Sequence, residues 1–224
     1  MGRFVIRIAY LSFLGLLLLA GQAFAHPHVW ADMRSQLVIG DDGTIQGVTV
    51  QWTTDKTYAL DALDGFKPDA DGNYSAEDLA KLTAENLDAL KDYGWFIFFR
   101  FNGELKEIGT PTEGRQTYNP KDGRLTLYFT APLKEPLDPR KGTVDLKVYD
   151  PEFFIDFEYV DDKPLLINKA LAPGCTADLL PIVGDAGLQQ TKDMLATKDK
   201  NWKPENGEDF GAMFAQAAEV KCTP

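Results

Sequence analysis

The sequence predicts a mainly β protein of the α+β class, with an antiparallel β-sandwich-like core, one inserted helix and short helices near the C-terminus. Two patterns lead to this prediction. Short segments of alternating polar and apolar residues recur along the chain, and one long segment between them carries leucines at helical spacing. Hydrophobic residues make up 44% of the 224 residues, which is enough for one packed domain.

Two strands joined by a hairpin are expected first. In Val29–Ile39 the odd positions are mostly apolar and the even positions mostly polar, as in a strand with one buried face. Asp41-Asp42-Gly43 predicts a turn, because aspartate followed by glycine favours the tight turns of hairpins. The return strand carries apolar residues at alternating positions: Val48, Val50 and Trp52.

A helix is expected over Ser75–Tyr93. Ser75 and Asp78 resemble a capping box, and leucines recur at helical spacing up to Gly94. The next segment, Trp95–Phe101, is apolar on both faces apart from one arginine, which predicts a buried strand. The helix therefore interrupts the series of strands.

Alternation predicts further strands in Leu125–Thr130 and Val144–Val148. Beyond Asp150 the apolar residues move to odd positions through Phe153–Tyr159, and this change of parity predicts a bulge or corner at Asp150. Leu165–Ile167 is expected to be an edge strand. The other face of the 153–159 strand is expected to be solvated, with three acidic residues: Glu152, Asp156 and Glu158.

The C-terminal part of the chain contains two weakly helical segments, Gly184–Lys200 and Gly207–Ala218. It also contains the only two cysteines, Cys175 and Cys222. In an exported protein an even pair predicts a disulfide before it predicts a metal site. Closing the long loop between them would contribute roughly 4 kcal/mol to stability in the chain-entropy model.

Residues 1–25 are predicted to be a cleaved signal peptide. Arg3 and Arg7 form a basic start, Ile8–Ala20 is almost wholly apolar, and Ala23-Phe24-Ala25 places small residues at the two positions that a signal peptidase reads. A retained transmembrane helix is the alternative, but the apolar run is shorter than the roughly 20 residues that span a bilayer. We therefore expect residues 26–224 to form a single periplasmic domain that does not itself span the membrane.

The composition and motifs exclude two classes of function. The chain has 23 Lys and Arg against 34 Asp and Glu, with a formal net charge of −11 at pH 7. Nucleic acid binding needs an excess of positive charge, so nucleic acid is not an expected partner. The sequence contains no G-x-S-x-G, H-E-x-x-H or phosphate-loop motif, and we expect the protein not to be an enzyme.

The candidate metal site lies at the start of the expected mature chain. His26 and His28 are the only histidines, and cleavage would also free an α-amino group at His26. Pro27 has no amide hydrogen, which excludes the square-planar copper or nickel motif that uses a deprotonated second amide. On a strand the two histidines would be about 6.6 Å apart on one face, so both rings can reach one ion.

Asp55 and Asp150 are the carboxylates expected to complete this site, because each follows the end of a predicted strand. Asp32 is roughly 13 Å along the strand from His28 and cannot share the ion. Two imidazoles with carboxylates are a ligand set that zinc accepts, and nickel, cobalt and copper accept it too. The alternative is a disordered terminus with two solvated histidines.

An EF-hand-like segment, residues 57–93, offers a second set of oxygen ligands. With Gly72 at the obligatory glycine of a twelve-residue calcium loop, five side chains occupy positions 3, 5, 7, 9 and 12: Asp69, Asp71, Asn73, Ser75 and Asp78. Lys67 stands at position 1, where a carboxylate belongs. Calcium binding is therefore expected to be weak, and Ser75 has the alternative role of a helix cap.

Four segments together resemble a known family. They are the start His26–Trp30, the strand end Trp52–Asp55, the loop Asp69–Leu79 and the corner Tyr149–Phe154. In this order they are similar to a family of bacterial periplasmic proteins described as the periplasmic component of an uncharacterised ABC-type transport system. Its members are commonly found beside nickel/cobalt-type permeases, and the resemblance covers nearly the whole mature chain.

The resemblance implies a role in transition-metal uptake, with zinc, nickel or cobalt as the ion and an inner-membrane metal permease as the partner. Lys67 departs from the family pattern, in which the loop tends to start with an acidic residue. Two other functions stay open: a non-catalytic structural accessory of a permease, and a copper-binding protein that chelates through the amine and ring of His26. The oligomeric state is open as well.

Overall fold

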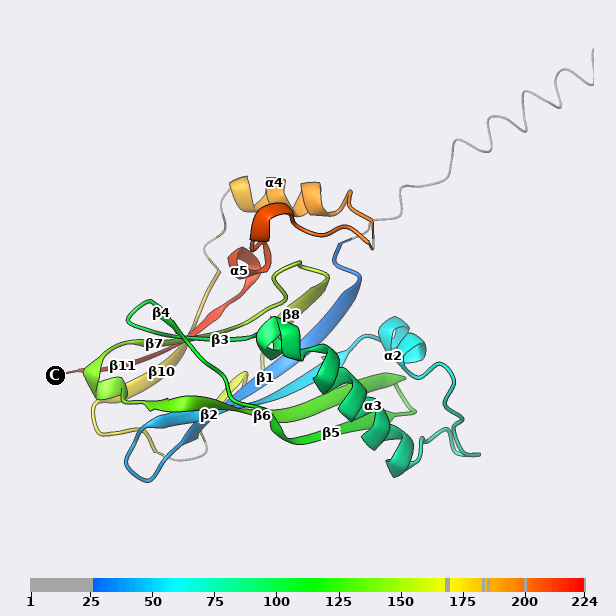
Figure 1. The fold of residues 1–224 in the computed structure, drawn as a ribbon, viewed down its shortest axis with the longest axis horizontal. Coiled ribbons are helices and arrows are strands. Elements are labelled where there is room, and N and C mark those ends of the chain that lie inside the picture. The colour runs from blue at the N-terminus through cyan, green and yellow to red at the C-terminus, as the bar shows by residue number, and fades with distance from the viewer. Residues whose placement is uncertain (1–25, 168–169, 183, 185, 200, 224) are drawn as a thin grey trace, which may run out of the picture.

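The computed structural model describes residues 26–167, 170–182, 184, 186–199 and 201–223. The predicted signal peptide lies outside this part of the chain. Two β-sheets form the body of the molecule, one group of helices covers the first sheet, and a second group packs above the end where β1 and β8 lie (Figure 1). The predicted mainly β, sandwich-like α+β fold is confirmed.

The first sheet has the strand order β5-β6-β2-β1-β8, and β9 also pairs with β1. Its strands are β1 (Val29–Ile39), β2 (Ile45–Thr54), β5 (Thr112–Asn119), β6 (Arg124–Leu137), β8 (Ile155–Tyr159) and β9 (Leu165–Ile167). The β1–β2 hairpin and the short strand at 165–167 are as predicted. β8 and β9 run parallel to β1, whereas the other pairs are antiparallel.

The second sheet has the order β10-β11-β7-β3-β4 and is antiparallel throughout. Its strands are β3 (Ile97–Phe101), β4 (Glu104–Lys106), β7 (Val144–Val148), β10 (Cys175–Leu180) and β11 (Ala217–Cys222). The sequence pattern did not reveal β4, β5, β10 or β11. In β4 and β10 no residue is fully buried and in β5 only Gln116 is, so these strands lack an apolar face that alternation could signal.

The main core lies between the facing surfaces of the two sheets. The first sheet contributes Met33, Leu37, Val50 and Phe129, and the second contributes Phe99, Leu146 and Val148. β2 and β6 come so close at Gly47 that a Cβ there would overlap the carbonyl oxygen of Ala131. Gly47 also borders a shift in the register of these strands, so only glycine fits this position.

The inserted segment contains two helices, α2 (Lys56–Ala62) and α3 (Ala76–Ala89). Helix α2 was not predicted from the sequence pattern. Both helices pack on the first sheet through a second apolar cluster of Ala59, Leu63, Leu82 and Leu125. The predicted helix end at Tyr93 is wrong, because a 3-10 turn, η2 (Lys91–Phe96), follows Leu90, and Gly94, Trp95 and Phe96 all have positive φ. The next strand therefore starts at Ile97 instead of Trp95.

The predicted corner at Asp150 is confirmed. β7 ends at Val148 in the second sheet and β8 begins at Ile155 in the first, so residues 149–154 carry the chain from one sheet to the other. The expectation that Asp156 is solvated is wrong, since it is only 7% exposed. Its carboxylate lies 3.8 Å from the Lys192 ammonium group of helix α4 (Ala186–Leu195), and burial raises its pKa.

Helix α4 confirms the central part of the helical prediction for Gly184–Lys200. The helical prediction for Gly207–Ala218 is wrong for most of its length, because only α5 (Gly211–Phe214) is α-helical there and β11 begins at Ala217. Ala218 and Val220 alternate into the core of the second sheet, and this pairing decides the conformation. Two short 3-10 turns complete the secondary structure: η3 (Pro139–Lys141) and η4 (Glu205–Gly207).

The predicted disulfide between Cys175 and Cys222 is present. The two residues face each other in the register of β10 and β11, and the bond closes a loop with a sequence separation of 47. Within the described residues, the helices are too short or too polar to cross a membrane.

We predict that the Cys175→Ala/Cys222→Ala double variant unfolds with a free energy about 3–4 kcal/mol lower than that of the oxidised protein, because the unfolded chain regains the entropy of the open loop. Equilibrium urea denaturation of both proteins measures this difference. A loss below about 1 kcal/mol would mean that the bond restricts the unfolded chain far less than the chain-entropy model requires.

Candidate functional site

The two histidines lie side by side where β1 begins. Their ring centroids are 5.0 Å apart, at an interplanar angle of 74°. The backbone N–H of His28 donates to the Phe154 carbonyl oxygen at 2.9 Å, so the chain is fixed against the corner just before β1 starts. His26 is only 3% exposed and His28 is half-buried. The two rings therefore lie close together, and this segment is packed against the rest of the protein. That they converge on one ion stays a prediction.

Aromatic side chains surround the histidine pair. His28 stacks on the Phe154 ring at a centroid distance of 4.8 Å. The ring of His26 meets Phe154 and Trp202 edge to face, at 5.9 and 5.6 Å. Trp202 belongs to the C-terminal segment, which packs on the corner through Phe153, Leu195 and Phe214. Trp202 could not be assigned to this site from the sequence, because no local pattern places a residue so distant in sequence beside His26.

Asp150 organises the corner next to the histidines. It is 4% exposed, and its carboxylate accepts backbone hydrogen bonds from Glu152, Phe154 and Ile155 at 3.0–3.1 Å. Burial raises the pKa of Asp150 to about 6, against the opposing effect of these N–H donors. The carbonyl oxygen of Asp150 is also covered so closely by Gly211 of α5 that no side chain fits at that glycine.

Asp55 links the start of β1 to the inserted helices. Its carboxylate caps helix α2 by accepting from the backbone N–H groups of Thr57 and Tyr58, at 2.7 and 3.1 Å. The second carboxylate oxygen accepts from the Trp30 N–H at 3.1 Å, and the Asp55 N–H donates to the Trp30 carbonyl oxygen. An N-cap aspartate of this kind is the signal that could have revealed helix α2.

The structure thus brings together two of the four predicted metal ligands, His26 and His28. Among the described residues, no three His, Cys, Asp or Glu side chains are grouped closely enough to hold one metal ion. Asp55 and Asp150 each use three acceptor positions of a carboxylate that has about four, so one position remains on each. Their role as ligands stays a prediction.

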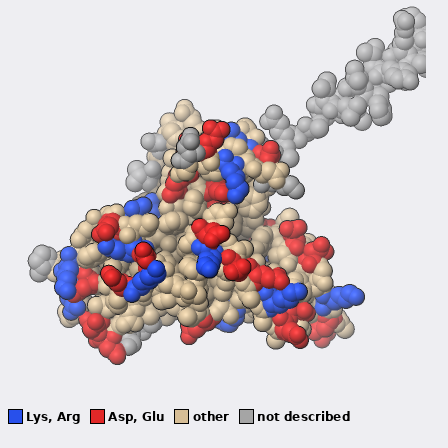
Figure 2. Space-filling model, in the orientation of Figure 1, with Lys and Arg blue, Asp and Glu red and all other residues tan. Residues whose placement is uncertain are grey.

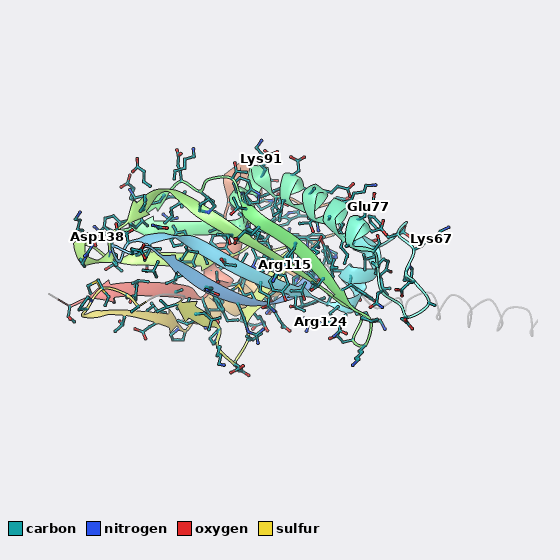
Figure 3. The ribbon with its side chains drawn as sticks, turned by 90° about the horizontal axis from the view of Figure 1, so that it is seen from below. Lys67, Glu77, Lys91, Arg115, Arg124 and Asp138 are labelled. Carbon is teal, nitrogen blue, oxygen red and sulfur yellow. A yellow bond between two sulfur atoms is a disulfide. The ribbon has the colours of Figure 1, made fainter. Side chains whose placement is uncertain are left out.

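Asp32, excluded above as a ligand of this metal site, has another partner. Its carboxylate receives a 2.7 Å hydrogen bond from the Arg124 guanidinium group, which also donates to the carbonyl oxygens of Thr53 and Thr54. Arg124 therefore joins the ends of β1, β2 and β6. The guanidinium group of Arg115 lies over the Tyr128 ring at 3.8 Å, and Figure 3 labels both arginines on the first sheet.

The EF-hand-like loop is closed by its own hydrogen bonds. The Asp69 carboxylate accepts from the backbone N–H groups of Asp71 and Asn73, and the pKa of Asp69 is lowered mainly by the Asn73 bond. Ser75 caps α3 by accepting from the Asp78 N–H, and its hydroxyl donates to the Asp78 carboxylate. The alternative role of Ser75 as a helix cap is confirmed. Lys67 is exposed at the same end of the molecule (Figure 3).

Charged side chains of both signs lie on the surface of the molecule. Figure 2 shows acidic and basic groups next to one another on the face that it presents. Several of them form exposed ion pairs, such as Lys134 with Glu107 at 2.6 Å and Lys81 with Glu85 at 3.9 Å. Exposed pairs of this kind contribute little to stability, so the excess of acidic residues acts mainly through the overall field.

Fold and site together define a two-sheet β-sandwich protein with a helical insertion on one sheet, a disulfide at a sheet edge and a histidine pair held against an aromatic corner. A family model described as "protein of unknown function (DUF1007)" matches residues 11–222. The chain belongs to this family. No curated protein is similar enough to the chain to count as a match.

We predict a specific pH dependence for Asp150. Because its pKa is about 6 in the folded protein and near 3.8 ordinarily, the folded state holds a proton that the unfolded chain releases between about pH 4 and 6. The stability of the wild type should therefore fall as pH rises through this window, by about 3 kcal/mol at most relative to Asp150→Asn. Urea denaturation of both proteins at several pH values measures this. A rise of wild-type stability over the same window would show that the three N–H donors outweigh burial.

For the EF-hand-like loop we predict no calcium-dependent change in the thermal unfolding transition at millimolar calcium. Lys67 supplies a positive charge at the first ligand position, and Asp69 and Asp78 are already engaged in hydrogen bonds. Thermal melts with calcium and with chelator test this. An upward shift that disappears in Asp69→Ala/Asp71→Ala would instead identify a working calcium site.

Proposed function

We propose that the protein is a periplasmic component of a transition-metal uptake system, which captures a divalent cation and passes it to an inner-membrane permease. Zinc is the ion expected first, followed by nickel and cobalt. The observation that carries the proposal is the pair of imidazole rings of His26 and His28, 5.0 Å apart at the start of β1. Neutral imidazole is the commonest nitrogen ligand for these ions in proteins.

The packing around the pair supports a pre-organised site. The His28 backbone is hydrogen-bonded to Phe154, its ring stacks on the Phe154 ring, and His26 lies against Trp202. Side chains that are already held in place lose less conformational freedom when they bind a ligand. The acidic character of the chain adds a favourable field for cations, because cleavage would remove Arg3 and Arg7 and no acidic residue.

The small number of nitrogen donors is compatible with a site that takes up and releases its ion. A structural zinc site uses four protein ligands, whereas this terminus offers two imidazoles and, after cleavage before His26, an α-amino group. The remaining coordination positions would be left to the predicted carboxylate ligands, Asp55 or Asp150, to water or to the side chains of another protein. Such open positions suit a carrier, because the ligands of the acceptor must reach the ion before the donor releases it.

The periplasmic location and the permease partner are inferred from other observations than the histidine pair. The N-terminal sequence favours export, and the disulfide between Cys175 and Cys222 is typical of an oxidising compartment. The permease is inferred from the sequence resemblance alone.

A structural accessory of a permease is the second candidate function. The observation that favours it is the use of Asp55 and Asp150, which hold a helix cap and a corner by hydrogen bonds to the backbone. In that case the histidines would serve to pack the terminus against Phe154 and Trp202. A copper-binding protein that chelates through the amine of His26 is the third candidate function. Isothermal titration with zinc, nickel and copper distinguishes the three candidate functions.

We predict that protein exported and processed by a bacterial host binds zinc or nickel with a stoichiometry near one, and that His26→Ala/His28→Ala binds at least about 100-fold more weakly. Binding should weaken steeply below about pH 6, because imidazole and amine ligands must be deprotonated. Isothermal titration with zinc, nickel and copper measures both effects. A preference for copper that survives loss of His28 alone would favour the copper-binding function.

The matched control is Asp69→Ala/Asp71→Ala, which removes two exposed carboxylates of the other candidate site and leaves the histidines intact. It should bind transition metals as the wild type does. Mass spectrometry must first place the N-terminus at His26, since a preceding residue would remove the free amine of that histidine. If correctly processed protein binds no better than the double alanine variant, the accessory function stands and metal capture is wrong.

A further inference from the structure

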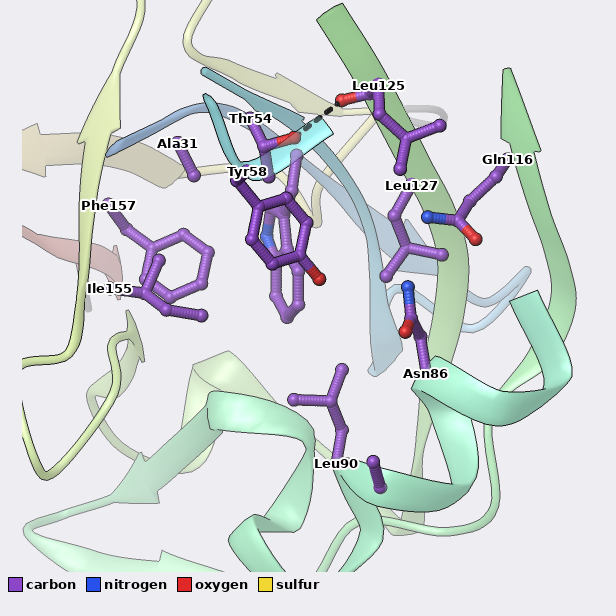
Figure 4. A pocket seen from close by; sticks show the side chains of 12 residues that line it. Ala31, Thr54, Tyr58, Asn86, Leu90, Gln116, Leu125, Leu127, Ile155 and Phe157 are labelled. Carbon is purple, nitrogen blue, oxygen red and sulfur yellow. Dashed lines mark hydrogen bonds between the residues drawn. The ribbon is translucent and has the colours of Figure 1, made fainter. Parts of the chain in front are cut away.

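A cavity of about 140 Å³ lies between helix α3 and the first sheet (Figure 4). Its walls come from β1, β2, β5, β6 and β8 on one side and from α2 and α3 on the other. The lining includes Trp52, Tyr58, Asn86, Leu90, Leu127 and Phe157. Figure 4 shows the side chains of Asn86 and Leu90 pointing from the helix toward the sheet, with Asn86 next to Leu127. Ala89 is exposed and lies at the rim.

The cavity is mainly apolar and contains a few polar groups. The Trp52 indole N–H is buried, in a residue that is 4% exposed, and has no acceptor among the described residues. The Asn86 amide and the Tyr58 hydroxyl add hydrogen-bonding capacity, whereas the Thr54 hydroxyl already donates to the Leu125 carbonyl oxygen at 3.2 Å. A buried donor without a partner is unfavourable. The Nε1 atom has almost no surface open to the cavity, so an acceptor gains this hydrogen bond when the side chains around the indole shift to admit it.

The packing explains why the space is open. Helix α3 is held to β5 and β6 through Leu82 and its neighbours in the second apolar cluster. At its C-terminal end the chain turns away through η2, where Trp95 enters the main core and its indole N–H donates to the Leu87 carbonyl oxygen. These two anchors fix the helix at a distance from Trp52 that the small side chains of Ala31 and Ala89 do not fill.

We propose that this cavity binds a small neutral molecule, made of an aromatic or branched apolar group with one hydrogen-bond acceptor that takes the Trp52 N–H. The volume matches such a molecule, because a cavity of about 150 Å³ holds benzene. The absence of charged residues among the lining side chains that the structure describes argues for a neutral ligand, since an ion there would lose its hydration without a counter-charge. This site is separate from the histidine pair and does not depend on metal binding.

Three probes of similar shape test the proposal: acetophenone, with a carbonyl acceptor; ethylbenzene, without one; and benzoate, which is charged. Acetophenone should bind with a Kd of about 0.1–1 mM and shift the indole N–H signal of Trp52 in nitrogen-15 NMR spectra. Ethylbenzene should bind about tenfold more weakly, because it makes no hydrogen bond, and benzoate should give no shift. The Trp52 signal is identified by its loss in Trp52→Phe, which should also remove the preference for acetophenone.

Two substitutions fill the cavity from opposite sides: Ala31→Leu from the sheet and Ala89→Phe from the helix. Each should abolish probe binding. Ala80→Phe is the matched control, because Ala80 is exposed on the same helix and does not line the cavity. If Ala31→Leu fails to fold, Ala89→Phe at the rim still decides the question.

Circular dichroism and the spread of the NMR signals establish that each variant is folded. The proposal is wrong if acetophenone leaves the Trp52 signal of the folded wild type unchanged at millimolar concentration. It is equally wrong if both filled variants bind acetophenone as well as Ala80→Phe does, since the probe would then occupy another site. Binding of benzoate as tight as that of acetophenone would overturn the neutral ligand class.

Discussion

The carboxylate of Asp150 accepts three backbone hydrogen bonds inside the short segment that carries the chain from the second sheet to the first. These N–H groups have no alternative acceptor in a strand ladder, so the corner depends on this one side chain. The same segment presents Phe154, whose carbonyl oxygen fixes the chain before β1 and whose ring stacks on His28. It also presents Phe153 to the C-terminal helices. The start of the domain, its corner and its C-terminal segment therefore form one packed unit.

Strand β8 connects that unit with the rest of the molecule. Its first residue, Ile155, donates its N–H to Asp150 and lines the cavity with its side chain. The strand also pairs in parallel with β1, so the residues after His28 and the wall of the cavity share one stretch of sheet. Asp55 joins α2 to the Trp30 backbone. The buried Asp150 and the half-buried Asp55 thus both fix the chain around the start of β1, one through β8 and the other through the end of β2.

Much of the sandwich could be predicted because its central strands each bury one face. β1, β2, β6 and β7 alternate clearly, and the corner was visible as a change of parity at Asp150. β5 and β10 could not be predicted because they bury few side chains. The helix predicted over 207–218 was wrong because its alanines fit equally well in a strand that pairs with β7. The histidine pair could be predicted because its members are neighbours in sequence. The position of Trp202 could not be predicted, since Trp202 and His26 are far apart in the sequence.

The amino-acid sequence by itself determined the fold class, the disulfide partners, the proximity of His26 and His28 and the cap at Ser75, because each of these follows from local spacing or from a count of residues. Only the tertiary structure decided that Asp55 and Asp150 are engaged by backbone N–H groups, that Asp156 is buried, and that a cavity remains beneath α3. The physical reason is that burial, hydrogen-bond saturation and empty space are properties of elements packed together, and no segment of the chain carries them alone.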